Sequence, residues 1–265
     1  MLKLNKDSVL GTFVIIISFC LVCSVLVSSV VVALDPFKVA AIANDRQVSI
    51  LKVSGFDVEG SVSQTYKKHI EAHLLNVETG NLEDDAVAAD QIDGYNFASL
   101  AKKPETSVAI EKARDVAGIR SHSKYMPVYF SKDDNGKVVR VIVPFYGQAL
   151  WSTVFGYVAI DPYDGNTVKA VTFYSHGETP GLGGEIDNPR WQAFWVDKKI
   201  NNENGEYMFS ICKKADHEGA GKDFQIDALS GATLTSNGVN NTAHYWLGDA
   251  YQPFFKNLPK IVENK

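Results

Sequence analysis

The residues between positions 227 and 239 carry the densest chemistry in this chain. They read Asp-Ala-Leu-Ser-Gly-Ala-Thr-Leu-Thr-Ser-Asn-Gly-Val, with four hydroxyl side chains close together: Ser230, Thr233, Thr235 and Ser236. Gly231 and Gly238 let a ligand approach the backbone, and a helix expected to begin nearby would offer free N–H groups to an anion. The segment therefore predicts a phosphate site in which one hydroxyl can be esterified. A polar loop that caps a helix is the alternative.

A second segment, residues 177–185, reads Gly-Glu-Thr-Pro-Gly-Leu-Gly-Gly-Glu. Its glycines and Pro180 predict a sharply bent loop. Gly181 and Gly183 flank Leu182, so the backbone can lie flat against a planar ligand that Leu182 touches. Taken alone, the loop is also explained as a tight connection between a strand and a helix.

The two segments together resemble the covalent FMN-binding domain family. Glu-Thr-Pro-Gly-Leu-Gly at 178–183 precedes Ser-Gly-Ala-Thr at 230–233, with Asn-Pro-x-Trp at 188–191 between them. The whole chain is similar to the C subunits of Na+-translocating NADH:quinone reductases, in which one N-terminal membrane helix carries an outer domain. The polar stretch 78–106 carries no motif of that family.

The resemblance implies that FMN is joined through its phosphate to the hydroxyl of Thr233. Ser230, Gly231 and Ala232 would surround the attachment, and Asp227 fills an acidic position of the family pattern. A separate flavin transferase would make the bond from FAD, because a neutral threonine hydroxyl is a poor nucleophile without an activating base.

The same resemblance places one group of residues along the isoalloxazine ring: Glu178, Thr179, Gly181, Leu182 and Gly183. Trp151 is a further candidate for a ring neighbour, and a core aromatic beside the sheet is its alternative. His176 lies next to the loop, where a structural or surface role is favoured over a contact with the flavin.

The implied function is electron transfer in which the flavin performs the redox step. The complex would oxidise NADH, reduce ubiquinone and export Na+. This chain has no G-x-G-x-x-G after a strand, so an NADH site falls to partner subunits. No catalytic or metal-binding residue is predicted. Two alternatives are the equivalent subunit of the ferredoxin:NAD+ oxidoreductase (Rnf) complex, which the Leu-Thr-Ser-Asn-Gly-Val context argues against, and a membrane-anchored binding protein without a redox role.

The N-terminus predicts a membrane anchor, because residues 9–34 contain no charged side chain. About 20 apolar residues cross a bilayer as a helix. Signal-peptide cores are shorter and end at an A-x-A-like site, which is missing here. Lys3 and Lys6 place residues 1–8 in the cytoplasm by the positive-inside bias. The following domain is then expected on the periplasmic side of a bacterial inner membrane.

The rest of the chain predicts an α+β fold, with residues 35–120 as a helical N-terminal part and 121–265 as the FMN-binding core. Two hairpins, 126–130 with 138–143 and 157–160 with 167–174, predict an antiparallel sheet covered on one face. Short strands are expected at 206–212 and 224–226. Helices are expected at 37–54, 62–75, 107–120 and 236–250, with a further start at Asn188 and Pro189 and a long loop over 78–106.

Composition and isolated motifs exclude several other functions. A content of 45% hydrophobic residues indicates a globular protein, and a net charge of −5 without a basic run excludes nucleic acid as a partner. His69 and His73 have a metal-ligand spacing, but two ligands do not close a metal shell. Cys20 and Cys23 fall inside the anchor as ordinary apolar residues, and Cys212 stands alone, so no disulfide framework is expected.

Overall fold

The computed structural model describes residues 8–57 and 60–263. The chain divides into two compact units, Met1–Asp45 and Arg46–Lys265. Helix α1 (Val9–Ser54) begins in the first unit and ends in the second. Among the described residues, Val9–Asp35 is the one helical span long and apolar enough to cross a membrane, and its most apolar stretch has no buried residue. It contains the span predicted from residues 9–34.

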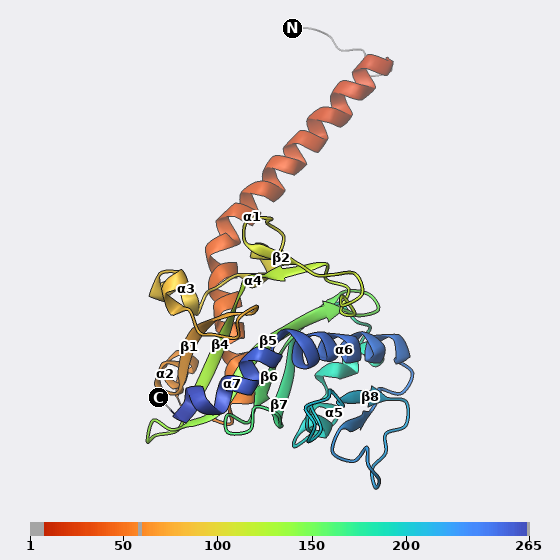
Figure 1. Ribbon diagram of the computed structural model, residues 1–265. Coiled ribbons are helices and arrows are strands. Elements are labelled where there is room, and N and C mark those ends of the chain that lie inside the picture. Colours follow the sequence, from red (N-terminus) through yellow and green to blue (C-terminus); the bar gives the residue numbers. More distant parts are fainter. Residues whose placement is uncertain (1–7, 58–59, 264–265) are drawn as a thin grey trace. The chain divides into compact units, whose positions relative to one another are not determined.

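The second unit is built on a five-stranded antiparallel sheet with the order β1-β4-β5-β6-β7 (Figure 1). Its strands are β1 (Ile70–Asn76), β4 (Tyr125–Lys132), β5 (Val138–Gln148), β6 (Thr153–Ile160) and β7 (Val168–Ser175). Both predicted hairpins are confirmed. In the first turn, the Asp133 carboxylate accepts hydrogen bonds from the N–H groups of Asn135 and Lys137, which fixes the Asn-Gly reversal.

The sheet is buried on both faces. Along β5, Val141, Val143 and Phe145 belong to the larger core, whereas Ile142 between them belongs to a smaller core on the other side. The same alternation runs through the neighbouring strands, since successive side chains of a strand point to opposite faces. The prediction of one covered face is therefore wrong. The nearly continuous apolar run at 138–146 is the pattern that a strand covered on both sides requires.

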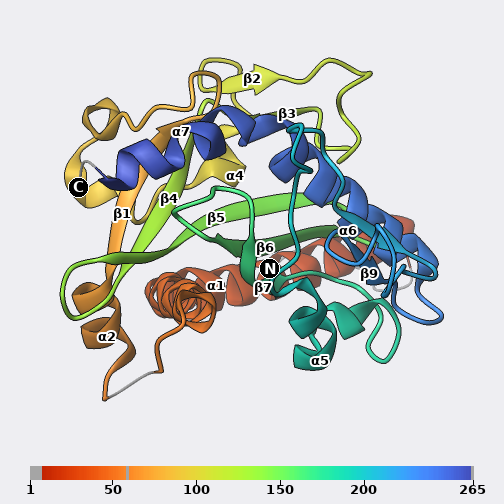
Figure 2. The same ribbon diagram turned by 60° about the horizontal axis from the view of Figure 1, so that its bottom comes forward.

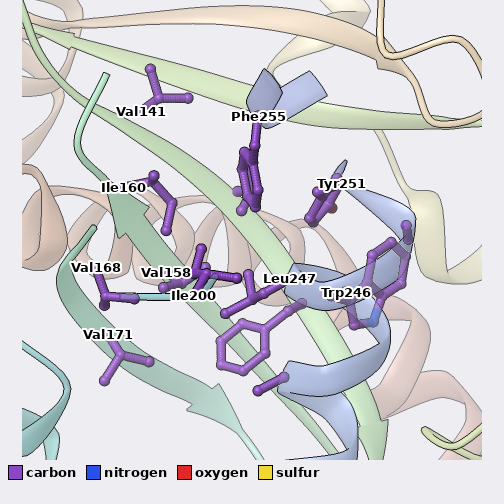
Figure 3. Packing of buried hydrophobic residues seen from close by; sticks show 14 of the residues in the cluster. Val141, Val158, Ile160, Val168, Val171, Ile200, Trp246, Leu247, Tyr251 and Phe255 are labelled. Carbon is purple, nitrogen blue, oxygen red and sulfur yellow. The ribbon is translucent and has the colours of Figure 1, made fainter. Parts of the chain in front are cut away.

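The larger core lies between the sheet and the C-terminal helices, α6 (Thr233–Tyr245), the π-helical turn η4 (Trp246–Ala250) and α7 (Gln252–Glu263) (Figure 2). Leu247 and Phe255 pack with Val158 and Ile160 of β6 (Figure 3). The indole of Trp246 donates to the Tyr146 carbonyl at 2.7 Å, so its polar atom is satisfied inside the core. The predicted helix 236–250 thus begins three residues earlier and continues into a second helix.

The smaller core lies between the other face of the sheet and the end of α1. Ile50, Leu51 and Val53 pack there with Tyr129 and Tyr157, which confirms helix at 37–54.

Helix α2 (Val62–His69) is shorter than the predicted 62–75. From Ile70 the chain pairs with β4 instead, so His69 and His73 share no helical face. His69 Nδ1 lies 2.8 Å from the Lys132 carbonyl, and His73 Nδ1 lies 2.7 Å from Asp84 Oδ2. The ladder along β4 outweighs the local helical pattern.

The connection from β1 to β4 contains only short elements. These are η1 (Asp84–Ala86), α3 (Ala89–Ile92), α4 (Phe97–Leu100), β2 (Ser107–Ala109) and β3 (Ser121–Ser123). The predicted helix at 107–120 is wrong, because β2 pairs with β3. Asp115 accepts hydrogen bonds from the N–H groups of Ile119 and Arg120 and so stabilises a turn in place of a helix.

The chain after β7 forms the other side of the larger core. It contains η2 (Gly183–Asp187), α5 (Pro189–Gln192), η3 (Ala193–Trp195), and the parallel pair β8 (Ser210–Cys212) and β9 (Gln225–Asp227). The helix start at Asn188 is confirmed, since its side chain accepts the Arg190 N–H at 3.0 Å. The two predicted strands are present but shorter.

Candidate functional site

The loop 177–185 and the start of α6 lie against each other. The Thr235 hydroxyl donates to Glu178 Oε2 at 2.6 Å, although the two residues are 57 positions apart. A Cβ atom on Gly183 would stand 2.4 Å from Thr235 Oγ1, so only glycine permits this approach. A Cβ atom on Gly231 would meet Leu182 Cδ2 at 3.5 Å. The two segments singled out in the sequence therefore form one site.

Glu178 is the buried centre of this site. Its side chain is 5% exposed, and its Oε1 accepts hydrogen bonds from the backbone N–H groups of Trp151 at 2.8 Å and Ser152 at 3.2 Å. With Thr235 on Oε2, the carboxylate joins the β5–β6 turn, the loop and α6. All three partners donate, which is the arrangement that an acceptor-only, ionised carboxylate requires.

The four hydroxyls of the segment divide into two environments. Ser230 and Thr233 are exposed, whereas Thr235 and Ser236 are each 1% exposed. Thr235 is bonded to Glu178, and Ser236 Oγ accepts the Leu229 N–H at 3.0 Å. A ligand or a modifying enzyme can therefore reach Ser230 and Thr233 only.

Thr233 is the first residue of α6. The N-cap residue Ala232 makes no side-chain capping hydrogen bond. The first turn of a helix has N–H groups without intrahelical partners, and its dipole favours a negative charge. An anion attached at Thr233 would thus stand at the end of the helix that stabilises it.

The loop itself presents an exposed apolar edge. Gly181 has φ +75°, a left-handed conformation that favours glycine, and the Thr179 carbonyl accepts the Leu182 and Gly184 N–H groups. Leu182 is left 48% exposed and Trp151 69% exposed. The alternative for Trp151, a core aromatic, is therefore wrong.

Asp227 supports the site from outside. Its Oδ1 accepts the Ala215 N–H at 2.9 Å and its Oδ2 lies 2.7 Å from His217 Nε2. The Ala215 hydrogen bond, helped by His217, lowers the pKa of Asp227 below its usual range. The carboxylate therefore fixes the chain before β9, and it acts on residues 215 and 217 rather than on the hydroxyls that follow it.

His176 has the structural role that was favoured for it. Its Nε2 lies 2.8 Å from Asp187 Oδ2, and its Nδ1 accepts the Glu178 N–H at 3.2 Å. The neutral tautomer with its proton on Nε2 satisfies both contacts. The imidazole thus fastens the beginning of the loop to its end.

Two supporting residues were missed in the sequence. Thr235 holds Glu178, and Ser152 Oγ accepts the Gly177 N–H at 2.6 Å. A helix turns by about 100° per residue, so Thr233 and Thr235 point to nearly opposite sides. That rotation would have separated an outer from an inner threonine, had the helix been predicted to begin at 233 rather than 236. Ser152 gives no comparable local signal.

The described part of the chain contains no group of three or more His, Cys, Asp or Glu side chains that could hold a metal ion. Cys20, Cys23 and Cys212 are free thiols.

The fold and the site together define a small-ligand domain with an exposed acceptor hydroxyl at a helix start and a glycine loop against it. Residues 150–248 match the FMN-binding domain family, and this range contains Trp151, the loop 177–185 and the segment 227–239. The chain is thus a flavoprotein of the FMN-binding class. More narrowly, it belongs to the family of C subunits of Na+-translocating NADH-quinone reductases, as three relatives show.

The C-type relative from Haemophilus ducreyi is 43% identical over 249 residues, which cover 94% of this chain and 93% of the relative. The one from Pasteurella multocida is 40% identical over 265 residues and covers 98% of each. The crystal structure of NqrC from Shewanella oneidensis has a TM-score of 0.75 at 32% identity, over 83% of this chain and 99% of that one. The α+β fold predicted from the sequence is confirmed.

Proposed function

We propose that this chain carries FMN as a phosphodiester on Thr233 and passes electrons within a membrane complex. The observation that carries the proposal is the position of Thr233, exposed at the start of α6, while Thr235 and Ser236 are buried and already bonded. The relatives are named as subunits of a Na+-translocating NADH-quinone reductase. In such a complex the chain would serve the oxidation of NADH, the reduction of ubiquinone and the export of Na+.

The attachment segment fits a phosphate diester. The diester keeps one negative charge, which the first turn of α6 stabilises through free N–H groups and the helix dipole. Gly231, with φ +75°, turns the backbone beside Thr233 without a side chain, and Ser230 offers an exposed hydroxyl next to it. Ala232 is buried, so it anchors the helix start and leaves Thr233 at the surface.

The loop 177–185 fits one side of a flat ring. Leu182 and Trp151 supply exposed apolar surface, while Thr179, Gly181 and Gly183 shape the backbone that bears Leu182. Glu178 lies beneath this backbone, so its part is to hold the loop and to place a negative charge below it. When bound, FMN supplies the one- and two-electron redox chemistry. An exposed site leaves that group open to neighbouring subunits.

Attachment would require a separate flavin transferase. Thr233 is exposed and so accessible to another enzyme. With FAD as donor, the Thr233 oxygen bonds to the phosphorus of the FMN half, the pyrophosphate bond breaks, AMP leaves and the hydroxyl loses its proton. The bond retains the flavin on the periplasmic side of the inner membrane, where the domain would stand if residues 1–8 are cytoplasmic.

Covalent attachment is tested by in-gel fluorescence. The full chain, co-expressed with a flavin transferase, should give a fluorescent band after denaturation in SDS. Thr233→Ala should abolish this band, whereas Thr235→Ser, which changes a buried hydroxyl of the same segment, should keep it. A fluorescent Thr233→Ala band would place the acceptor elsewhere. A wild-type band that never fluoresces would leave reversible ligand binding as the function of the site.

A further inference from the structure

We infer that Thr235 is a positioning residue of the flavin site: its buried hydroxyl holds Glu178, which in turn holds the loop 177–185 and the turn bearing Trp151. The inference deepens the proposed function and rests on it, since it assigns the support of that same site.

The hydrogen bond between Thr235 and Glu178 has the features of a strong contact. The oxygen atoms are 2.6 Å apart, and the residues are 1% and 5% exposed. Hydrogen bonds to an ionised acceptor are short and strong, and a buried carboxylate depends on every donor it has. The backbone N–H groups of Trp151 and Ser152, which are also neutral donors, both bind Oε1. Removing the Thr235 hydroxyl therefore takes away the donor that serves Oε2.

The loop cannot move independently of this pair. A Cβ atom on Gly183 would be 2.4 Å from Thr235 Oγ1 and 2.9 Å from Glu178 Oε2, so the loop backbone rests directly on the two side chains. The bonds from Trp151 and Ser152 tie the β5–β6 turn to the same carboxylate. A displacement of Glu178 is thus transmitted to both walls of the site.

Thr233 and Thr235 divide the work of one helix turn. They lie about 200° apart around the axis of α6, so the outer hydroxyl is free for esterification while the inner one supports the loop. A change at position 235 should therefore alter flavin loading without touching the acceptor oxygen.

The test uses Thr235→Val, which keeps the branched shape without the hydroxyl, and Thr235→Ser, which keeps the hydroxyl. Amide hydrogen exchange is measured at Trp151 and Ser152 in the unloaded chain, and the initial rate of flavin incorporation is measured with transferase and FAD. For Thr235→Val we expect exchange faster by about tenfold and incorporation slower by about tenfold, the scale of a lost hydrogen bond to a buried charge. Thr235→Ser should restore both.

The matched control is Thr242→Val, which removes a buried hydroxyl from the same helix. Thr242 Oγ1 donates to the Gly238 carbonyl at 2.7 Å, away from Glu178, so this variant should leave both measurements unchanged. A second variant, Glu178→Gln, replaces a carboxylate oxygen by an amide that cannot accept, and it should match Thr235→Val. The double variant should add nothing further.

Wild-type rates in Thr235→Val would overturn the inference and leave the proposed function standing. If Thr235→Val does not fold, unchanged exchange at Trp151 and Ser152 in Glu178→Gln would overturn it equally. A wild-type chain that takes up no flavin would refute the proposed function, while the exchange measurement would still decide the role of Thr235.

Discussion

The outer and inner halves of the hydroxyl-rich segment contain the same residue types in opposite surroundings. Ser230 and Thr233 face solvent, whereas Thr235 and Ser236 are enclosed and bonded to Glu178 and to the Leu229 N–H. Hydroxyl chemistry alone does not separate the halves. Because α6 begins at Thr233, the helical rotation turns each side chain toward either ligand or core. One short segment thus serves attachment on one side and support on the other.

The largest contrast between the halves is expected at Thr233. Thr233→Val should remove all covalent flavin, because the acceptor oxygen is gone. An exposed substitution at a helix start should change the free energy of unfolding by no more than about 0.5 kcal/mol. Intact mass spectrometry gives the flavin content, and urea unfolding of the unloaded chain gives the stability. A loss of several kcal/mol would show that Thr233 belongs to the supporting half.

The contact beneath the loop is tested at Gly183. Gly183→Ala should lower the free energy of unfolding by about 1–3 kcal/mol, the usual cost of overpacking, because the new methyl group would stand 2.4 Å from Thr235 Oγ1. Gly94→Ala is the control, since nothing lies within 4 Å of its Cβ position. Chemical denaturation compares the two. Equal stability would mean that the loop does not rest on the inner half.

A smaller effect is expected from the two serines. Ser236→Ala should destabilise the unloaded chain by about 1 kcal/mol, because the Leu229 N–H loses its buried acceptor. Ser230→Ala should be nearly neutral, since that side chain is exposed. Thermal unfolding measures both variants. Identical melting temperatures for the two would remove the distinction between outer and inner hydroxyls.

The smallest effect concerns acid stability at Asp227. Its pKa is lowered in the folded state, first by the Ala215 N–H and then by His217. The resulting stability is present above the unfolded pKa of about 3.9 and is lost as pH falls through the folded value. Urea unfolding from about pH 5 to pH 3 should therefore weaken wild type slightly more than Asp227→Asn. Parallel curves would show that the exposed carboxylate adds nothing to the segment.

Local sequence signals predicted elements that need few distant partners. The Asn-Gly turn and its flanking strands, the Asn188 cap and the apolar span 9–34 were all predicted from neighbouring residues. Elements decided by distant pairing were missed. Residues 70–75 have a helical pattern, yet they pair with β4, and 107–109 join β3 rather than a helix. Backbone hydrogen bonds along a sheet outweigh weak helical propensity.

The sequence by itself determined which segments carry the flavin chemistry, because the two glycine- and hydroxyl-containing motifs stand in one order on an anchored α+β chain. It could not determine which threonine is the acceptor and which the support. That distinction depends on the residue at which α6 begins and on the burial of Glu178 under a loop some fifty residues earlier in the chain. Burial and the direction of a helical side chain are properties of the packed structure, so only the tertiary fold decided between Thr233 and Thr235.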